Sequence, residues 1–252
     1  MSASVSQSKK EKVRTVSFGS DFLYAHTRIE TVVFCYPIRM VYKTILFDVD
    51  GTLCDPGKSM IECARYALSK FGIHETDDEN LRRLIGPPLE HAFRDYYHFD
   101  EAQADQAVTY FRDMMQREGI QLYEAYPGIS ELLNELKQSG RRLAVVTSKI
   151  DHIAKETLVK TGLIDYFEFV SAQQPNVVVD KEEILTKALT ELNITDNSNI
   201  VMIGDRRHDV EAAKTHNIDS IGVLWGYGDR EELENEGATH IVTDTNELKR
   251  LL

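Results

Sequence analysis

The chain has 252 residues, of which 42% are hydrophobic, and it carries a formal net charge of −12. This length suits one large domain or a core domain with a smaller insertion, and the hydrophobic share is sufficient for a buried core. The negative net charge argues against nucleic acid or an anionic membrane surface as the main partner. An anionic substrate would need local cations at its site, because the overall field repels it.

Residues 1–40 differ in character from the rest of the chain. The segment "MSASVSQSKKEKVR" is polar and basic, which is typical of a disordered tail. The segment "TVVFCYPIRM" is too short and too interrupted for a membrane helix or a signal peptide. We therefore expect residues 1–40 to be a disordered or dispensable leader.

The cysteines indicate the compartment. Cys35, Cys54 and Cys63 share no metal-type spacing, and an odd number makes a poor disulfide framework. Reduced thiols in a cytoplasmic protein are the expectation that follows.

From residue 41 onward, short apolar runs alternate with amphipathic helical patterns. The apolar runs predict strands at 41–47, 142–148, 167–172, 199–205, 219–225 and 239–244. The amphipathic patterns predict helices at 129–140, 152–162, 181–193, 209–217 and 230–237. Such alternation predicts a doubly wound, Rossmann-like α/β fold, with a parallel sheet covered on both faces. Its ligand site should lie beyond the carboxyl ends of the strands.

One region interrupts this alternation. Four helical patterns follow one another at 59–73, 78–85, 88–98 and 101–119, with no convincing strand between them. We expect residues 59–126 to form a small α-helical cap domain. It would be inserted into an α/β core catalytic domain made of residues 41–58 and 127–252. The aromatic cluster "FRDYYHF" is expected to belong to the core of the cap rather than to a platform for base stacking.

Unusual polar residues gather at the predicted strand ends. They are Asp48, Asp50, Thr147, Ser148, Asp205 and Asp209, together with Lys181 at the start of a helix. A single aspartate after a strand is often only a turn former or a helix cap. Their arrival at one edge of one sheet favours a functional site instead.

This set of residues suits phosphoryl transfer. Asp48 and Asp50 point to the same side of extended chain and repel each other unless a cation lies between them. With Asp205 they form an oxygen-rich site suited to Mg²⁺. Thr147 can hold phosphate oxygens, and Lys181 can neutralise charge that spreads onto them. One carboxylate can then attack phosphorus while another handles protons.

The segments "DVDGTL", "VVTSK" and "IGDRRHD", with Lys181, resemble the four motifs of the haloacid dehalogenase superfamily in its phosphatase branch. The resemblance covers residues 41–252. The inserted helices resemble the cap of the phosphoglycolate phosphatase and β-phosphoglucomutase group. The segments "FGI", "IGPPL", "YPGISELL" and "GVLWGYG" resemble bacterial members labelled phosphoglycolate phosphatase or 5'-nucleotidase. One departure is that no proline follows Lys181, as it does in many relatives.

The resemblance implies roles for these residues. Asp48 would be the nucleophile and form an aspartyl-phosphate, and Asp50 would carry protons to the leaving oxygen and from water. Thr147 and the Ser148 amide would bind the phosphoryl group, and Lys181 would link it to the nucleophile.

A Mg²⁺ ion would be bound by Asp48, by the backbone carbonyl of Asp50 and by Asp205. Asp209 would support these ligands or join them.

Other residues have weaker claims to a role. Gly86, in "IGPPL", is either part of a substrate loop of the cap or simply a helix–helix connection. Lys149 follows the second motif directly and could point to solvent. His208 is expected to be peripheral, and Arg65, Arg82 and Arg83 are the cap arginines that could contact an anion or remain solvated.

The expected function is that of a Mg²⁺-dependent phosphomonoesterase acting on phosphoglycolate or a nucleoside monophosphate. A phosphomutase would use the same residues, and a phospho-aspartate receiver module also has an acidic pocket with Thr/Ser and Lys. A dehalogenase would not need Asp50, and a catalytically dead binding protein is disfavoured because no motif carboxylate is missing. We expect a monomer or small homo-oligomer with a small phosphorylated metabolite as its partner.

Overall fold

The computed structural model describes residues 42–85, 88–175 and 179–252. The expected leader at 1–40 and the candidate substrate-loop residue Gly86 lie outside these ranges. Within them, no helix combines the length and the apolar character needed to cross a membrane.

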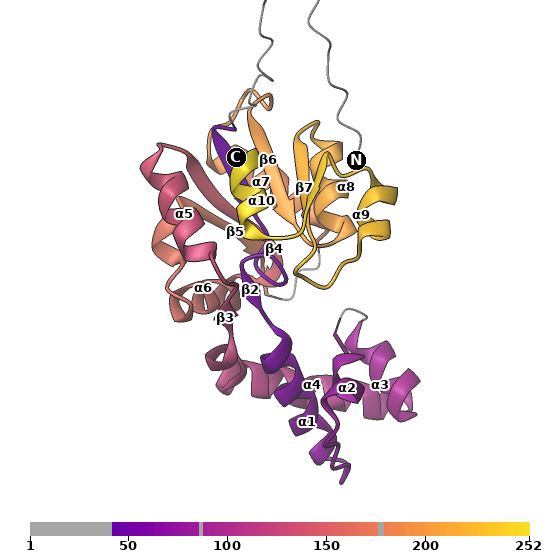
Figure 1. The fold of residues 1–252 in the computed structure, drawn as a ribbon. Helices are drawn as coiled ribbons and strands as arrows, with labels where there is room; N and C mark the ends of the chain where they lie inside the picture. The colour runs from indigo at the N-terminus through magenta and orange to yellow at the C-terminus, as the bar shows by residue number, and fades with distance from the viewer. Residues whose placement is uncertain (1–41, 86–87, 176–178) are drawn as a thin grey trace, which may run out of the picture. The chain divides into compact units, whose positions relative to one another are not determined.

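The core of the fold is one parallel sheet of six strands, ordered β5-β4-β1-β6-β7-β8 (Figure 1). The strands are β1 (Thr44–Phe47), β4 (Arg142–Ile150), β5 (Phe169–Gln173), β6 (Ile200–Gly204), β7 (Asp219–Val223) and β8 (His240–Val242). Every neighbouring pair in this order is parallel. All six predicted strands are therefore present, and the predicted fold class is confirmed.

Helices cover both faces of the sheet. They are α5 (Ile129–Gln138), α6 (Asp151–Lys160), α7 (Lys181–Glu191), α8 (Arg207–Thr215), α9 (Arg230–Glu236) and α10 (Thr245–Leu251). Side chains of β1 alternate between the faces, as the pleat requires. Ile45 and Phe47 join the cluster that contains buried residues of α5 and α10, whereas Leu46 joins the cluster of α7 and α8. This alternation produces the doubly wound arrangement.

The last helix, α10, is an element that the sequence pattern did not predict. It is seven residues long, so it offers few turns of periodicity. The Asp244 side chain caps its start by accepting from the backbone N–H groups of Asn246 and Glu247. Leu248 is fully buried in the same cluster as Ile45. Tertiary packing therefore supports a helix that is too short to stand alone.

A second group of helices lies between the first and second long strands of the chain. These inserted helices are α1 (Gly57–Ser69), α2 (Asp78–Arg82), α3 (Leu89–Tyr97) and α4 (Glu101–Arg117), followed by a short 3₁₀ turn, η1 (Gly119–Leu122). Phe93 is fully buried, with its ring stacked 5.9 Å from that of Phe99. The prediction that "FRDYYHF" contributes to a helical core is thus confirmed for Phe93 and Phe99, although Tyr96 stays 46% exposed.

Two very short strands connect the inserted helices to the sheet. They are β2 (Cys54–Asp55) and β3 (Glu124–Ala125), which pair antiparallel. Two residues are too few for a visible alternation, so no sequence pattern predicts these strands. The division into a core at 41–58 and 127–252 and a cap at 59–126 stays a prediction.

Candidate active site

The first motif forms a tight turn directly after β1. Asp48 is the first residue after the strand and is only 8% exposed. Gly51 adopts a φ of +79°, in the left-handed region that favours glycine. A Cβ at this position would lie 2.1 Å from Asp205 Oδ2. The turn therefore needs glycine both for its backbone conformation and for its approach to the fourth motif.

Three buried carboxylates meet at the carboxyl ends of β1 and β6. Asp48, Asp205 and Asp209 each bring one carboxylate oxygen to within 4.8 Å of the others. Asp205 and Asp209 are both 1% exposed. Lys181 Nζ lies 2.8 Å from Asp48 Oδ2 and 2.5 Å from Asp209 Oδ1. The first residue of α7 thus joins carboxylates from two different motifs.

The electrostatics of this cluster are unfavourable for three charged carboxylates. Burial, and then the neighbouring Asp209 and Asp48, raise the pKa of Asp205 to about 7. Burial also raises the pKa of Asp209, against the opposing effect of Lys181. Burial by itself lowers the pKa of Lys181, but Asp209 and Asp48 raise it by more, so that the lysine remains charged. One cation does not compensate three acids.

The donor set fits a divalent metal ion. Asp48 Oδ1 and Asp205 Oδ1 are buried without any hydrogen-bond partner among the described residues. Burying a carboxylate costs folding free energy unless it has an oppositely charged partner or binds a metal ion. Hard carboxylate oxygens are the ligands that Mg²⁺ prefers in proteins. Asp48, Asp205 and Asp209 can therefore hold a metal ion, whereas the Asp50 side chain lies outside this cluster.

The second motif lies where β4 loses its regular pairing with β5. The register shifts between Thr147 and Ile150, which is typical of a bulge that re-aims side chains. Thr147 is 2% exposed, and its hydroxyl accepts from the Lys149 backbone N–H at 3.3 Å. Both Thr147 and Ser148 line the same cavity as Asp48.

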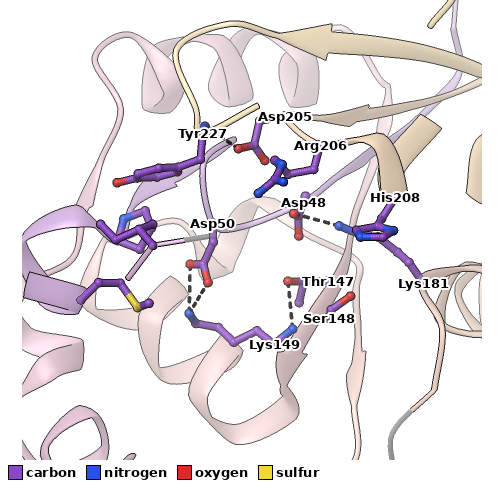
Figure 2. A pocket seen from close by; sticks show the side chains of 13 residues that line it. Asp48, Asp50, Thr147, Ser148, Lys149, Lys181, Asp205, Arg206, His208 and Tyr227 are labelled. Carbon is purple, nitrogen blue, oxygen red and sulfur yellow. Dashed lines mark hydrogen bonds and ion pairs between the residues drawn. The ribbon is translucent and has the colours of Figure 1, made fainter. Parts of the chain in front are cut away.

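Asp50 lies on the other side of that cavity, where Lys149 holds it (Figure 2). Lys149 Nζ donates to both Asp50 oxygens, at 2.9 and 2.7 Å, and to the Tyr123 hydroxyl oxygen at 2.7 Å. The Lys149 side chain is 9% exposed. Lys149 therefore does not point to solvent, the orientation that its place after the second motif had left open.

A loop after β7, Trp225 to Gly228, closes the site from the C-terminal half of the chain. The Trp225 indole N–H donates to Thr52 O at 3.1 Å, and the Tyr227 N–H donates to Asp205 Oδ2 at 2.8 Å. A Cβ on Gly228 would lie 1.9 Å from Asp205 O, so this approach requires a residue without a side chain.

The Tyr227 hydroxyl donates to Asp55 Oδ1 at 2.6 Å, on the strand that leads into the inserted helices. No local pattern in "GVLWGYG" predicts these contacts, because their partners Thr52, Asp205 and Asp55 lie far away along the chain.

These groups surround one cavity of about 370 Å³. It is lined by Asp48, Asp50, Pro56, Met60, Ile85, Thr147, Ser148, Lys149, Lys181, Asp205, Arg206, His208 and Tyr227. Figure 2 shows Asp48, Thr147 and Lys181 on one side and Asp50 and Tyr227 on the other. The strand ends therefore supply charged groups, and the entry to the inserted helices supplies apolar ones.

The cap arginines do not line this cavity within the described ranges. Arg65 pairs with Glu62 and Asp78, and Arg82 pairs with Glu79 at 3.3 Å. Arg83 lines a separate small cavity that includes Tyr96 and Tyr97. Of the cap's candidate substrate loop, only the flanking Ile85 can be placed at the cavity.

Comparison with known proteins identifies the family of the chain. Residues 45–223 match the family model described as haloacid dehalogenase-like hydrolase. The 5'-nucleotidase of Pseudomonas aeruginosa is 34% identical over 211 residues, which are 84% of this chain and 96% of that protein. The tyrosine-protein kinase PtkA of Mycobacterium tuberculosis is 33% identical over 202 residues, which are 80% of this chain and 68% of PtkA.

A solved structure from Clostridium difficile, provisionally assigned as a phosphatase, has a TM-score of 0.81 to this chain. The two are 37% identical, and the match covers 84% of this chain and 99% of that one. Relatives named phosphoglycolate phosphatase also match. The chain therefore belongs to the haloacid dehalogenase-like hydrolases, as its four motifs indicated, and it is a phosphatase-type enzyme of that family.

Proposed function

We propose that the protein is a Mg²⁺-dependent phosphomonoesterase that hydrolyses small phosphorylated metabolites through an aspartyl-phosphate on Asp48. The observation that carries the proposal is the buried cluster of Asp48, Asp205, Asp209 and Lys181, open to a cavity that also contains Thr147. Without a ligand such a cluster destabilises the fold, because its three carboxylates repel one another and only one lysine compensates them. A bound metal ion and phosphoryl group would account for its presence.

Asp48, Asp205 and Asp209 would hold the Mg²⁺, as the unpaired oxygens of Asp48 and Asp205 suggest. When bound, the ion would neutralise the repulsion between a carboxylate nucleophile and an anionic phosphoryl group. The resemblance to the family implies that the backbone carbonyl of Asp50 would be a further ligand of the ion.

The protein's own residues would carry the chemistry. Asp48 attacks phosphorus, the ester bond to the leaving oxygen breaks, and the phosphoryl group becomes bonded to Asp48. Lys181, 2.8 Å from Asp48, orients the nucleophile and compensates charge on the phosphoryl oxygens. Thr147, with the Ser148 amide, binds those oxygens. Water then releases inorganic phosphate and regenerates Asp48.

Asp50 would donate the proton that the leaving oxygen needs and later accept one from water. In the structure, both Asp50 oxygens face Lys149. Protonation of the leaving oxygen would therefore need one Asp50 oxygen to exchange its contact with Lys149 for one with the substrate, while the other oxygen keeps the lysine paired. The neighbouring segment leads through β2 into the inserted helices, so movement of these helices is a means of achieving that exchange.

The inserted helices would act as a cap domain at 59–126 that closes over the core and selects the substrate. Nucleoside monophosphates and phosphoglycolate are the substrate classes that we propose, by analogy with relatives. We further propose a cytoplasmic protein that functions as a monomer or small homo-oligomer without nucleic-acid or membrane partners.

The test is phosphate release across a panel of phosphorylated metabolites, with excess Mg²⁺ or with a chelator. We expect Mg²⁺-dependent release by the wild type and loss of nearly all activity in Asp48→Asn. Asp105→Asn, an exposed residue of α4, is the matched control and should retain activity. Full activity of Asp48→Asn would contradict the proposal.

Product analysis tests the alternatives. A phosphomutase would yield an isomeric phosphate ester instead of free phosphate. A receiver module would retain a stable phospho-aspartate without turnover. Either result would replace the phosphomonoesterase assignment.

A further inference from the structure

We infer that Tyr227, together with Pro56, Met60 and Ile85, forms an apolar subsite for a flat ring on the leaving group. The substrate would accordingly be a nucleoside monophosphate rather than a phosphorylated carboxylic acid. This inference rests on the proposed phosphatase function, and it assigns a role to the loop "GVLWGYG".

The first observation is the chemistry of the cavity on the side away from the strand ends. Pro56, Met60, Ile85 and Tyr227 all line it, and they come from three separate segments of the chain. Pro56 and Met60 belong to the entry into α1, Ile85 follows α2, and Tyr227 follows β7. Side chains of this kind bind aromatic rings by contact and stacking, with little demand for hydrogen bonds.

The second observation is that Tyr227 is fixed at both ends. Its backbone N–H donates to Asp205 Oδ2, and its hydroxyl donates to Asp55 Oδ1. The same Asp55 oxygen also accepts the Gly57 N–H at 2.8 Å, at the start of α1. A ring held in this way loses little conformational entropy when a ligand stacks on it. Its position is also tied to the metal-binding carboxylate, so that a leaving group on Tyr227 has a defined relation to Asp48.

The third observation concerns charge. Each lysine and arginine among the described lining residues already has a carboxylate partner. Lys149 pairs with Asp50, and Lys181 pairs with Asp48 and Asp209. Arg206 follows the same pattern, since it pairs with Glu232 at 3.0 Å. The imidazole of His208 is also occupied, because its Nδ1 lies 3.0 Å from Glu211 Oε2.

A carboxylate on the leaving group, as in phosphoglycolate, would have to displace one of these partners. It would also compete with Asp50 for Lys149, the cation that both Asp50 oxygens contact. A neutral ribose with a planar base avoids both problems. The volume of about 370 Å³ lies within the range of small-molecule pockets.

The experiment compares AMP with ribose 5-phosphate. Both release the same type of primary alcohol, so the ratio of their kcat/KM values isolates the contribution of the base. Stacking of one base on an aromatic side chain is known to contribute substantially to binding. We expect wild-type kcat/KM to be about 10-fold or more higher for AMP than for ribose 5-phosphate. We also expect phosphoglycolate to be a poorer substrate than AMP.

Three substitutions refine the test. Tyr227→Leu should reduce the AMP to ribose 5-phosphate ratio towards one. Tyr227→Phe keeps the ring and removes the bond to Asp55, so the ratio should persist even if the rate falls. Met60→Ala should also lower the ratio, because it removes an apolar contact supplied by α1 instead of the loop after β7. This variant keeps the test decisive if Tyr227→Leu does not fold. Tyr96→Leu, an exposed tyrosine of α3 outside the cavity, is the matched control and should leave the ratio unchanged.

The outcomes separate the inference from the function beneath it. Equal kcat/KM values for AMP and ribose 5-phosphate, preference for phosphoglycolate, or an unchanged ratio in both Tyr227→Leu and Met60→Ala would overturn the subsite. Absence of Mg²⁺-dependent phosphate release from every substrate in the wild type would instead overturn the proposed function.

Discussion

The two sides of the active-site cavity are built in different ways. On one side, Asp48, Asp205, Asp209 and Lys181 project from strand ends and a helix start, and none is more than 8% exposed. On the other side are Asp50, with a side chain that is 39% exposed, and Tyr227 (Figure 2). Both lie on loops that follow strands, and Met60, at the entry to the inserted helices, lines the same cavity. The proposed nucleophile, metal ligands and lysine therefore come from the core, whereas the groups proposed to meet the leaving group come from turns and connecting segments.

This difference has a physical reason. Parallel strands place their carboxyl ends at one edge of the sheet, and backbone hydrogen bonds fix their register. The positions of side chains at that edge are therefore well defined. Loops and short linkers have fewer such bonds and can vary in position. Changes on the strand side of the cavity (Asp48, Asp205, Asp209 and Lys181) should therefore affect both the reaction and folding. Changes on the linker side (Asp50, Tyr227 and Met60) should affect the reaction more selectively.

The largest expected effect is that of Lys181→Met. It removes the cation that contacts both Asp48 and Asp209 and leaves buried carboxylates uncompensated. We expect a loss of about 10²–10³-fold in kcat and a fall of about 3–5 kcal/mol in the free energy of unfolding without metal. Enzyme kinetics and urea denaturation measure these changes. Lys187→Met, an exposed residue of the same helix, should change neither, and comparable effects from both variants would contradict the assignment.

The next effect tests the tight turn of the first motif. Gly51→Ala combines a φ of +79° with a Cβ that would lie 2.1 Å from Asp205 Oδ2. We expect it to lower the free energy of unfolding by about 3 kcal/mol or more. Gly140→Ala is a matched control, because Gly140 has a φ of +80° but nothing within 4 Å of the added Cβ. It should cost about 1–2 kcal/mol, and equal losses would show that contact with Asp205 is unimportant.

A smaller and more selective effect is expected from Lys149→Met, at a residue near the end of β4 whose side chain reaches Asp50. Lys149 holds Asp50, the proposed proton carrier, and contacts Tyr123 near β3. We expect kcat for an alkyl phosphate to fall by about 10–100-fold. The rate with p-nitrophenyl phosphate should fall less, because that leaving group needs no proton.

Lys149→Arg should restore part of the difference. Lys155→Met, an exposed lysine of α6, serves as the control. If Lys149→Met slowed both substrates equally, the lysine would have a general structural role instead.

The smallest effect is a pH-dependent stabilisation by Mg²⁺. The pKa of Asp205, about 7 in the folded protein, lies above that of an unfolded aspartate. Its protonation therefore favours folding, and this stabilisation is lost as the pH rises from about 4 through about 7. At the proposed metal site, Mg²⁺ would bind the charged form of Asp205 and should offset the loss.

We therefore expect excess Mg²⁺ to raise Tm by about 5–10 °C at about pH 8 and by less at about pH 5.5. Differential scanning calorimetry with Mg²⁺ or with a chelator measures this. A larger shift at the lower pH would argue against the metal site.

Much of the core followed from the sequence because its physical causes are local. Six apolar runs separated by amphipathic helices leave few folds other than a doubly wound sheet. The same pattern brings Asp48, Thr147 and Asp205 to one edge, since the carboxyl ends of parallel strands coincide there. The two-residue strands β2 and β3 and the short helix α10 escaped this reasoning, because neither periodicity nor length marks them.

The sequence by itself determined the fold class, the family and the set of polar residues that share the sheet edge. Only the tertiary structure decided which partner each side chain has. Lys149 could have faced solvent, but the return of the chain through Tyr123 and β3 encloses it beside Asp50. Tyr227 lies 172 residues from Asp55 along the chain, yet the two share a hydrogen bond. Contacts of this range depend on how separate elements pack against one another, and no local pattern of residues encodes them.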